Sequence, residues 1–414
     1  MGLSGLETEQ PRAGTQQTSD DLAALIAAQQ PGFSLEQPFY SDPAIYARDI
    51  ERIFLCDWLY AGHVSQIPAA GDFFLFDVAT ESVIVVRGQN GEIRALVNVC
   101  RHRGSRVCLE RHGTAKSFVC PYHAWTYDLA GRLTATRLMP ADFEATDYGL
   151  KQIHIRVLRG FIFVNFADTP SDFDAVEQAL SDHLAPFGFE RAKVAHSGAY
   201  PIESNWKLAV ENYVECYHCA PAHPEFAKSH SIKFPRERIA KLTDAMLCRA
   251  KAVGLDGACV DRTGTAAGPD GVQIYFDRYA LFDGYLTGSE DGQPLAPLMG
   301  DIKDFDGGAS NIQVGPVTYF LAYCDHVVVY RFTPRDIQKT DCEIVWLVDE
   351  NAVEGKDYDL ARLTWLWHVT TEADKRIIEN NQKGVNSRFF APGPLAPMES
   401  HCRDFVAWYL QTIA

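Results

Sequence analysis

The sequence reads Cys100-Arg101-His102-Arg103-Gly104 and then, with 17 residues between, Cys120-Pro121-Tyr122-His123. Each segment carries one thiol and one imidazole within three positions of each other, and each follows a short β-type run, at 93–98 and at 118–120. Segments at the ends of neighbouring strands can face each other across a small volume. We therefore expect Cys100, His102, Cys120 and His123 to hold one metal centre.

Two kinds of centre use two thiolates and two imidazoles. One is a tetrahedral zinc ion. The other is a two-iron, two-sulfur cluster with both cysteines on one iron and both histidines on the other. Zinc fingers usually pair Cys with Cys and His with His along the chain, whereas here each segment mixes the two types. The pattern favours the [2Fe-2S] cluster, and the imidazoles would raise its reduction potential above that of an all-cysteine cluster.

A second pair of histidines lies at the end of a predicted helix over 206–219: His218 is within the helix and His223 follows it. His218 and His223 are five positions apart, which on a straight helix would separate their side chains by about 140°. Pro221 and Pro224 are expected to end or distort the helix and let His223 turn back toward His218. Two histidines and one carboxylate form the triad of non-haem Fe(II) sites that react with dioxygen, although zinc can take the same ligands.

The carboxylate of this second site has to come from elsewhere in the chain. Asp374 and Glu372 both lie near the predicted start of a helix at 372–383, and the residues alone do not separate them. Capping of that helix by Thr371 and Asp374 is a structural alternative. Glu215 precedes His218 by three positions, so it is expected on the same helix face, where it can accept the ring N–H of His218.

The surrounding pattern divides the chain into a small β domain and a larger mixed one. Short β-type runs and an Asn90-Gly91 hairpin turn lie within 45–167. Within 168–414, helical segments alternate with β-rich segments at 317–323, 327–333 and 341–348, and 254–273 reads as a loop or lid. We predict an α+β fold, with residues 1–44, an N-terminal tail and helix, belonging to the second domain.

Composition limits the classes of partner. The chain has 414 residues, 47% of them apolar, with 38 Lys+Arg and 54 Asp+Glu for a formal net charge of −16. Such a charge repels phosphate backbones and anionic lipid headgroups, so neither nucleic acid nor a membrane surface is an expected partner. No apolar run has membrane-spanning length, and the polar N-terminus lacks signal-peptide features, so a cytoplasmic location is expected.

On these motifs the chain resembles the α subunits of Rieske non-haem iron oxygenases, the ring-hydroxylating oxygenase family, from about residue 40 to 414. In that family the late acid lies about 150 residues after the second histidine, which favours Asp374 over Glu372. The family's bridging acid falls at Glu215, although it is more often Asp. The segments 215–219 and 379–384 resemble the branch that acts on quaternary ammonium compounds such as glycine betaine and stachydrine.

The resemblance implies the chemistry of a terminal oxygenase. It implies a Rieske [2Fe-2S] cluster, one mononuclear Fe(II), dioxygen as cosubstrate, and NAD(P)H electrons delivered by a separate reductase or ferredoxin. It also implies a Rieske domain joined to a catalytic domain with an antiparallel sheet, in a homotrimer. Electrons would cross to the neighbouring subunit's iron through Glu215.

The expected activity is oxidative N-demethylation of a betaine-like compound with release of formaldehyde. Hydroxylation of an aromatic ring or aromatic acid is the alternative, and a Rieske electron carrier without enzymatic activity is a third possibility. A quaternary ammonium group requires aromatic faces. Tyr319, Phe320 and Tyr323 are the candidates for lining its pocket.

Overall fold

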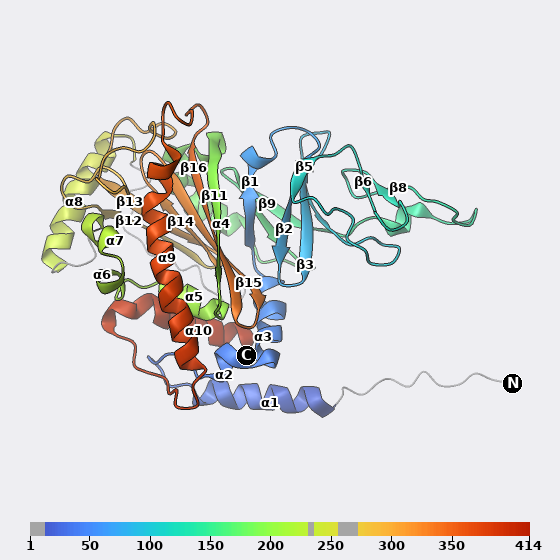
Figure 1. Ribbon diagram of the computed structural model, residues 1–414, viewed down its shortest axis with the longest axis horizontal. Helices are drawn as coiled ribbons and strands as arrows, with labels where there is room; N and C mark the ends of the chain where they lie inside the picture. Colours follow the sequence, from blue (N-terminus) through green and yellow to red (C-terminus); the bar gives the residue numbers. More distant parts are fainter. Residues whose placement is uncertain (1–12, 231–235, 256–271) are drawn as a thin grey trace.

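The computed structural model describes residues 13–230, 236–255 and 272–414. Its strands form three antiparallel sheets: seven-stranded β1-β10-β9-β4-β3-β2-β5, six-stranded β11-β16-β15-β14-β13-β12, and three-stranded β6-β7-β8. Figure 1 shows a β-rich lobe on one side, ending in β6–β8, and a larger mixed part on the other. The expected α+β class with antiparallel sheets is confirmed.

The seven-stranded sheet combines hairpins of consecutive strands with pairings between strands that are distant in sequence. Its strands are β1 (Leu59–His63), β2 (Asp72–Val78), β3 (Glu81–Arg87), β4 (Ile93–Val97), β5 (His112–Thr114), β9 (Gln152–Leu158) and β10 (Phe161–Asn165). Val83, Ile84, Val85 and Val86 are almost fully buried, as a β-branched run in a central strand should be. The predicted Asn90-Gly91 turn joins β3 to β4, and Gly91 has the positive φ of 83° that such a turn requires.

The three-stranded sheet, β6 (Phe118–Val119), β7 (Thr126–Tyr127) and β8 (Leu133–Ala135), carries the second Cys-His segment between β6 and β7. A separate core cluster under the two segments includes Cys100, Cys120, Trp125 and Tyr127. The two segments therefore rest on a small hydrophobic base of their own.

The six-stranded sheet has a different core on each of its faces. Its strands are β11 (Ala192–Ile202), β12 (Ile274–Ala280), β13 (Gly308–Val314), β14 (Thr318–Ala322), β15 (Val327–Asp336) and β16 (Lys339–Asp349). On β14, Tyr319 belongs to one core cluster and Phe320 to the other. Successive strand residues point to opposite faces, so only the Tyr319 side of the sheet can face the cavity described below.

The helices of the described residues are α1 (Ala13–Ala28), α2 (Pro38–Ser41), α3 (Pro43–Asp49), α4 (Asp174–Leu184), α5 (Trp206–Tyr213), α6 (Cys219–Ala222), α7 (Pro224–Ser229), α8 (Arg236–Ala252), α9 (Leu360–Val385) and α10 (Ser400–Ile413). Of these, α5 and α9 belong to the core on the Tyr319 face of the six-stranded sheet, and α4 and α8 belong to the core on its other face. The long helix α9 crosses in front of the sheet in Figure 1 and packs against α5 and β11.

Two expected helices differ from the structure. The helix predicted over 206–219 ends at Tyr213, and the helix predicted over 372–383 is part of the longer helix α9, which begins at Leu360. The N-terminal helix expected within 1–44 is α1, which begins at Ala13. The predicted loop over 254–273 lies mostly outside the described residues.

The domain limits at 44/45 and 167/168 stay a prediction. Within the described ranges, no helix has both the length and the apolar character that a membrane crossing demands.

Candidate active site

The two Cys-His segments fold into loops of the same backbone design. The amide of Cys100 donates to the carbonyl of Ser105, five residues on, and the amide of Cys120 donates likewise to Trp125. In each loop the residue four positions after the cysteine donates back to the cysteine carbonyl and has a positive φ, 76° at Gly104 and 58° at Ala124. Both segments thus present their cysteine and histidine in the same way.

The loops separate thiols from imidazoles. Nδ1 of His102 and Nδ1 of His123 lie 3.1 Å apart at the exposed tip, whereas Cys100 and Cys120 are buried beneath them. The indole ring of Trp125 stacks on His102 at 4.8 Å, and the Tyr127 hydroxyl lies 3.3 Å from the Cys100 thiol. This segregation fits a two-iron cluster with thiolates on one iron and imidazoles on the other.

His218, His223 and Asp374 come together in the larger part of the molecule. Nε2 of His218 and Nε2 of His223 lie 3.2 Å and 3.0 Å from the same oxygen, Oδ1 of Asp374. The two imidazole rings are 5.1 Å apart between centroids and nearly perpendicular. Three donor atoms therefore converge on one small volume, as the ligands of a single metal ion do.

The donor atoms have unmet bonding requirements that suit a metal ion. Neither ring nitrogen of the buried His223 makes a hydrogen bond of proper geometry, and neither does Oδ1 of Asp374. Such orphaned buried atoms are costly unless something binds them. Burial lowers the pKa of His218, whereas the neighbouring carboxylates of Asp374 and Glu215 raise it to about 10, so negative charge gathers around this imidazole. Such a charge distribution favours a bound cation.

Glu215 contacts His218 as expected, but through a turn and not along a helix. Its Oε1 lies 2.5 Å from Nδ1 of His218, and its Oε2 accepts hydrogen bonds from the backbone amides of Tyr217 and His218. In a continued helix those amides would bond to carbonyls four residues back. The carboxylate takes them instead, which explains why α5 ends early.

Asp374 lies in the middle of α9 and not at a helix start, so it caps nothing. Thr370, Thr371 and Ile378 are buried on the same side of α9, three or four residues away, and Glu372 is exposed. The helix therefore points Asp374 inward and Glu372 outward. This arrangement brings Asp374 to the histidines and leaves Glu372 out.

A buried network that sequence reasoning missed holds α5 in place. Oδ2 of Asp49 forms a fully buried ion pair with Lys207 and accepts a hydrogen bond from Trp206 at 3.1 Å, while the Tyr409 hydroxyl donates to Oδ1 at 2.8 Å. Asn205 caps the helix by accepting the amide of Lys207. The segment Asn205-Trp206-Lys207 thus ties α5 to α3 and α10, and no local signal marks Asp49 as its partner.

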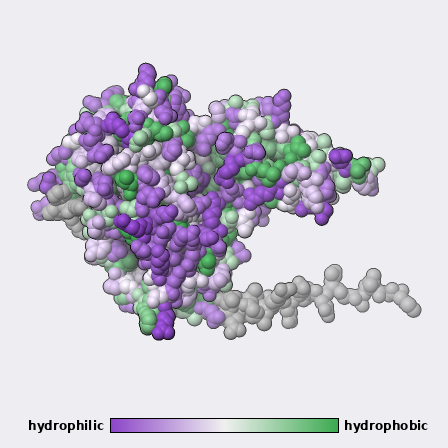
Figure 2. All heavy atoms as spheres, in the orientation of Figure 1, coloured by the Kyte–Doolittle hydropathy of each residue, from purple (hydrophilic) through white to green (hydrophobic). Residues whose placement is uncertain are grey.

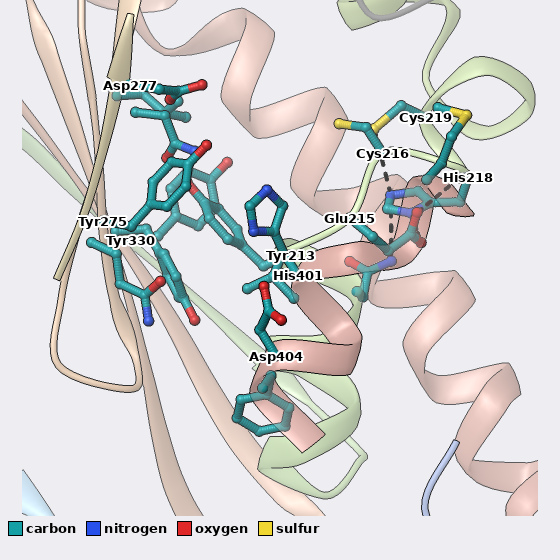
Figure 3. Close-up of a pocket in the computed structure, with 18 of the residues that line it drawn as sticks. Tyr213, Glu215, Cys216, His218, Cys219, Tyr275, Asp277, Tyr330, His401 and Asp404 are labelled. Carbon is teal, nitrogen blue, oxygen red and sulfur yellow. Dashed lines mark hydrogen bonds and ion pairs between the residues drawn. The ribbon is translucent and has the colours of Figure 1, made fainter. Parts of the chain in front are cut away.

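A cavity of about 640 Å³ opens beside His218, His223 and Asp374. Figure 3 shows Tyr275, Tyr330 and Asp277 along the sheet, Glu215 and His218 on the opposite side, and His401 and Asp404 from α10 between them. Its volume is in the range of small-molecule sites. A smaller cavity of about 200 Å³ lies behind, and Glu215 and His218 line both.

Aromatic rings form much of the cavity wall. Tyr213 stacks on Tyr319 with centroids 4.2 Å apart and lies 5.1 Å from Tyr330, and Trp367 is 5.9 Å from Tyr330. Of the three aromatic residues proposed for the pocket, Tyr319 lines it. Phe320 and Tyr323 are core residues, which was the alternative for all three. Phe320 faces the opposite core, and Tyr323 is fully buried with its hydroxyl 2.8 Å from Nε2 of His230.

Comparisons with known proteins agree with these two centres. Residues 57–153 match the model of the Rieske [2Fe-2S] domain, and residues 189–414 match that of the ring-hydroxylating α-subunit catalytic domain. The glycine betaine monooxygenase oxygenase subunit of Pseudomonas aeruginosa is 37% identical over 394 residues, 94% of this chain and 90% of that protein.

Two further comparisons extend the likeness. The carnitine monooxygenase oxygenase subunit of Acinetobacter baumannii is 32% identical over 361 residues, 84% of each chain. A crystal structure of a quaternary ammonium Rieske monooxygenase superposes with a TM-score of 0.71 at 22% identity, covering 94% of this chain and 98% of the other. The similarity to this crystal structure shows that the two chains share the same fold.

Proposed function

This chain belongs to the Rieske family of ring-hydroxylating oxygenase α subunits, and on that premise we propose that it is the oxygenase component of a quaternary ammonium N-demethylase. Members of the family are oxidoreductases that carry a [2Fe-2S] cluster and a mononuclear iron, use dioxygen, and receive electrons from a separate reductase. The observation that carries the proposal is the 37% identity to a glycine betaine monooxygenase subunit across nearly the whole chain.

In this proposal Cys100, His102, Cys120 and His123 hold the cluster, and a second set of residues holds the mononuclear iron. That set is His218, His223 and Asp374, supported by the convergence of their donor atoms. When bound there, the iron supplies the means to activate dioxygen. Glu215 accepts the Nδ1–H of His218 and so leaves Nε2 free to face the metal.

The cavity wall supports a cationic, methylated substrate. A quaternary ammonium group cannot donate a hydrogen bond, so it is held by aromatic faces and by nearby negative charge. Tyr213, Tyr319, Tyr330 and Trp367 provide the faces close to Asp374. The substrate's methyl groups would then lie against the iron site, with its remaining part extending along the sheet.

The proposed overall reaction is balanced. One oxygen atom of dioxygen enters a methyl C–H bond and the other leaves as water, with two electrons and two protons supplied. The resulting N-hydroxymethyl group releases its hydroxyl proton and leaves as formaldehyde, and the amine retains the electron pair of the broken C–N bond. The amine product therefore carries one methyl group fewer.

A substrate panel tests the proposal. The purified protein, loaded with iron and coupled to a Rieske-type reductase with NADH, is expected to release formaldehyde from at least one quaternary ammonium compound. Aromatic acids and bicyclic arenes form the second arm of the panel. A phenol or diol from that arm, with no formaldehyde from the first, would select ring hydroxylation instead.

We also propose a homotrimer in which the lobe that carries His102 and His123 contacts another subunit; the exposure of these two histidines supports it. Figure 2 shows hydrophobic residues on that lobe, and Leu109, Val119 and Leu138 are large hydrophobic side chains exposed there. Sedimentation should give three chain masses, and a stable monomer would contradict the proposal. A cytoplasmic location completes it, since the described cysteines are free thiols.

A further inference from the structure

The far end of the large cavity holds two polar side chains, each with one buried acceptor oxygen that has no hydrogen-bond partner. Oδ1 of Asp277 and Oδ1 of Asn311 are both buried without a hydrogen-bond partner. The two residues are direct partners in the β12–β13 ladder, so they lie side by side on the sheet. Both line the cavity, and Figure 3 places Asp277 across it from Glu215 and His218.

The alternation of side chains along β12 places Asp277 on the face of the strand that lines the cavity. Tyr275, Asp277 and Tyr279 on β12 line the cavity, while Phe276 and Ala280 belong to the core on the opposite face. A carboxylate on such a wall loses hydration, and a buried acceptor without a partner is costly. Two such acceptors at paired positions point to a ligand that donates hydrogen bonds.

We infer that Asp277 and Asn311 form a second recognition point, which accepts a hydrogen bond from a hydroxyl or amino group at the end of the substrate remote from the oxidised methyl group. This inference rests on the proposed function and narrows it. The preferred substrate is then an ammonium compound with a net positive charge and a donor at its other end. A substrate carrying a carboxylate at that end meets the charge of Asp277 and is disfavoured.

The protonation state of Asp277 agrees with this role. Burial raises its pKa to about 6, against a hydrogen bond from Tyr275 that lowers it. At neutral pH the group is therefore still mainly ionised, and it accepts a hydrogen bond as a charged group.

Three probes of similar size separate donor recognition from charge. Choline and propyltrimethylammonium have the same charge and shape but differ by a hydroxyl in place of a methyl, and glycine betaine carries a carboxylate. Anaerobic titration calorimetry on the iron-loaded protein should show choline binding roughly 10- to 100-fold more tightly than propyltrimethylammonium. Glycine betaine should bind more weakly than choline.

Substitutions assign the preference to Asp277. In Asp277→Ala the ratio between choline and propyltrimethylammonium should fall to within about threefold of unity. Asp277→Asn keeps an acceptor without charge, and it should retain an intermediate ratio, which preserves the test if the alanine variant does not fold. Asp404→Ala removes an exposed acid from the same cavity and should weaken both probes equally, leaving their ratio unchanged.

Equal binding of the two probes by the unmodified protein, or an unchanged ratio in both Asp277 variants, would overturn the inference. So would tighter binding of glycine betaine than of choline. If glycine betaine is then demethylated, the proposed function stands and only the recognition point fails. If no quaternary ammonium compound binds or releases formaldehyde, both fail together.

Discussion

At the scale of single residues, the carboxylate of Glu215 makes two kinds of contact. One carboxylate oxygen contacts Nδ1 of His218, and the other accepts the two backbone amides that end the turn after α5. The same side chain therefore sets the tautomer of a proposed iron ligand and the path of the backbone that carries it.

Replacing Glu215 by alanine should release both constraints. We expect iron affinity to fall by roughly 10- to 100-fold and turnover to be lost, because the ring of His218 is no longer oriented. Iron titration followed by metal analysis measures the first effect, and the visible spectrum of the [2Fe-2S] cluster should not change. The matched control is Glu211→Gln, one helical turn earlier, where the carboxyl contacts Tyr40. Near-normal iron binding and turnover in Glu215→Ala would refute its role.

Asp374 and Glu372 offer a second matched pair. Asp374→Ala should lower the iron content from about three to about two atoms per chain, because two remain in the cluster and the mononuclear site loses its carboxylate. Glu372→Ala, two residues earlier on the exposed side of α9, should keep all three. Metal and acid-labile sulfide analysis of both variants decides the matter, and equal iron loss in the two would contradict the assignment.

At the scale of elements, sequence patterns predicted the residues of the candidate site but not the local structure and the buried contacts that hold them in place. Apolar periodicity predicted a helix that continues through His218, but the helix ends at Tyr213. Periodicity does not take into account a side chain that competes for backbone amides, as the carboxylate of Glu215 does. The spacing of the buried residues Trp367, Thr371 and Ile378 does select Asp374 over Glu372, so that signal was present. Strand alternation likewise shows that Tyr319 and Phe320, which are adjacent in sequence, cannot both face the same cavity.

The position of Asp49 could not be predicted, because its partners Lys207 and Tyr409 are distant in sequence and no spacing rule connects them. Asp49→Ala leaves the buried Lys207 charge unpaired, and we expect a loss of about 3–5 kcal/mol in the free energy of unfolding. Denaturant titration that follows the unfolding of the catalytic domain measures this change in free energy. Glu92→Ala breaks the exposed contact with Arg94 and should cost under about 1 kcal/mol. Similar costs for both would show that the network does not anchor α5.

At the scale of the whole molecule, the two centres lie in separate parts of the fold. The two Cys-His loops lie on the β-rich lobe, and the proposed iron ligands lie between α9 and the six-stranded sheet (Figure 1). Sequence spacing predicted the cluster residues and the two histidines, and the family resemblance added Asp374. The cavity that extends from these residues to Asp277 depends instead on how four strands and six helices pack. We therefore expect the substrate preference to be set by tertiary structure.

The measurement that tests the central claim most directly is a single turnover without a reductase. The iron-loaded protein is chemically reduced, mixed with a quaternary ammonium compound labelled with carbon-13 in its methyl groups, and exposed to dioxygen. The account predicts labelled formaldehyde and the corresponding tertiary amine in equal amounts, with none in Asp374→Ala. Consumption of dioxygen with no labelled formaldehyde, under conditions in which an aromatic compound is hydroxylated, would contradict it.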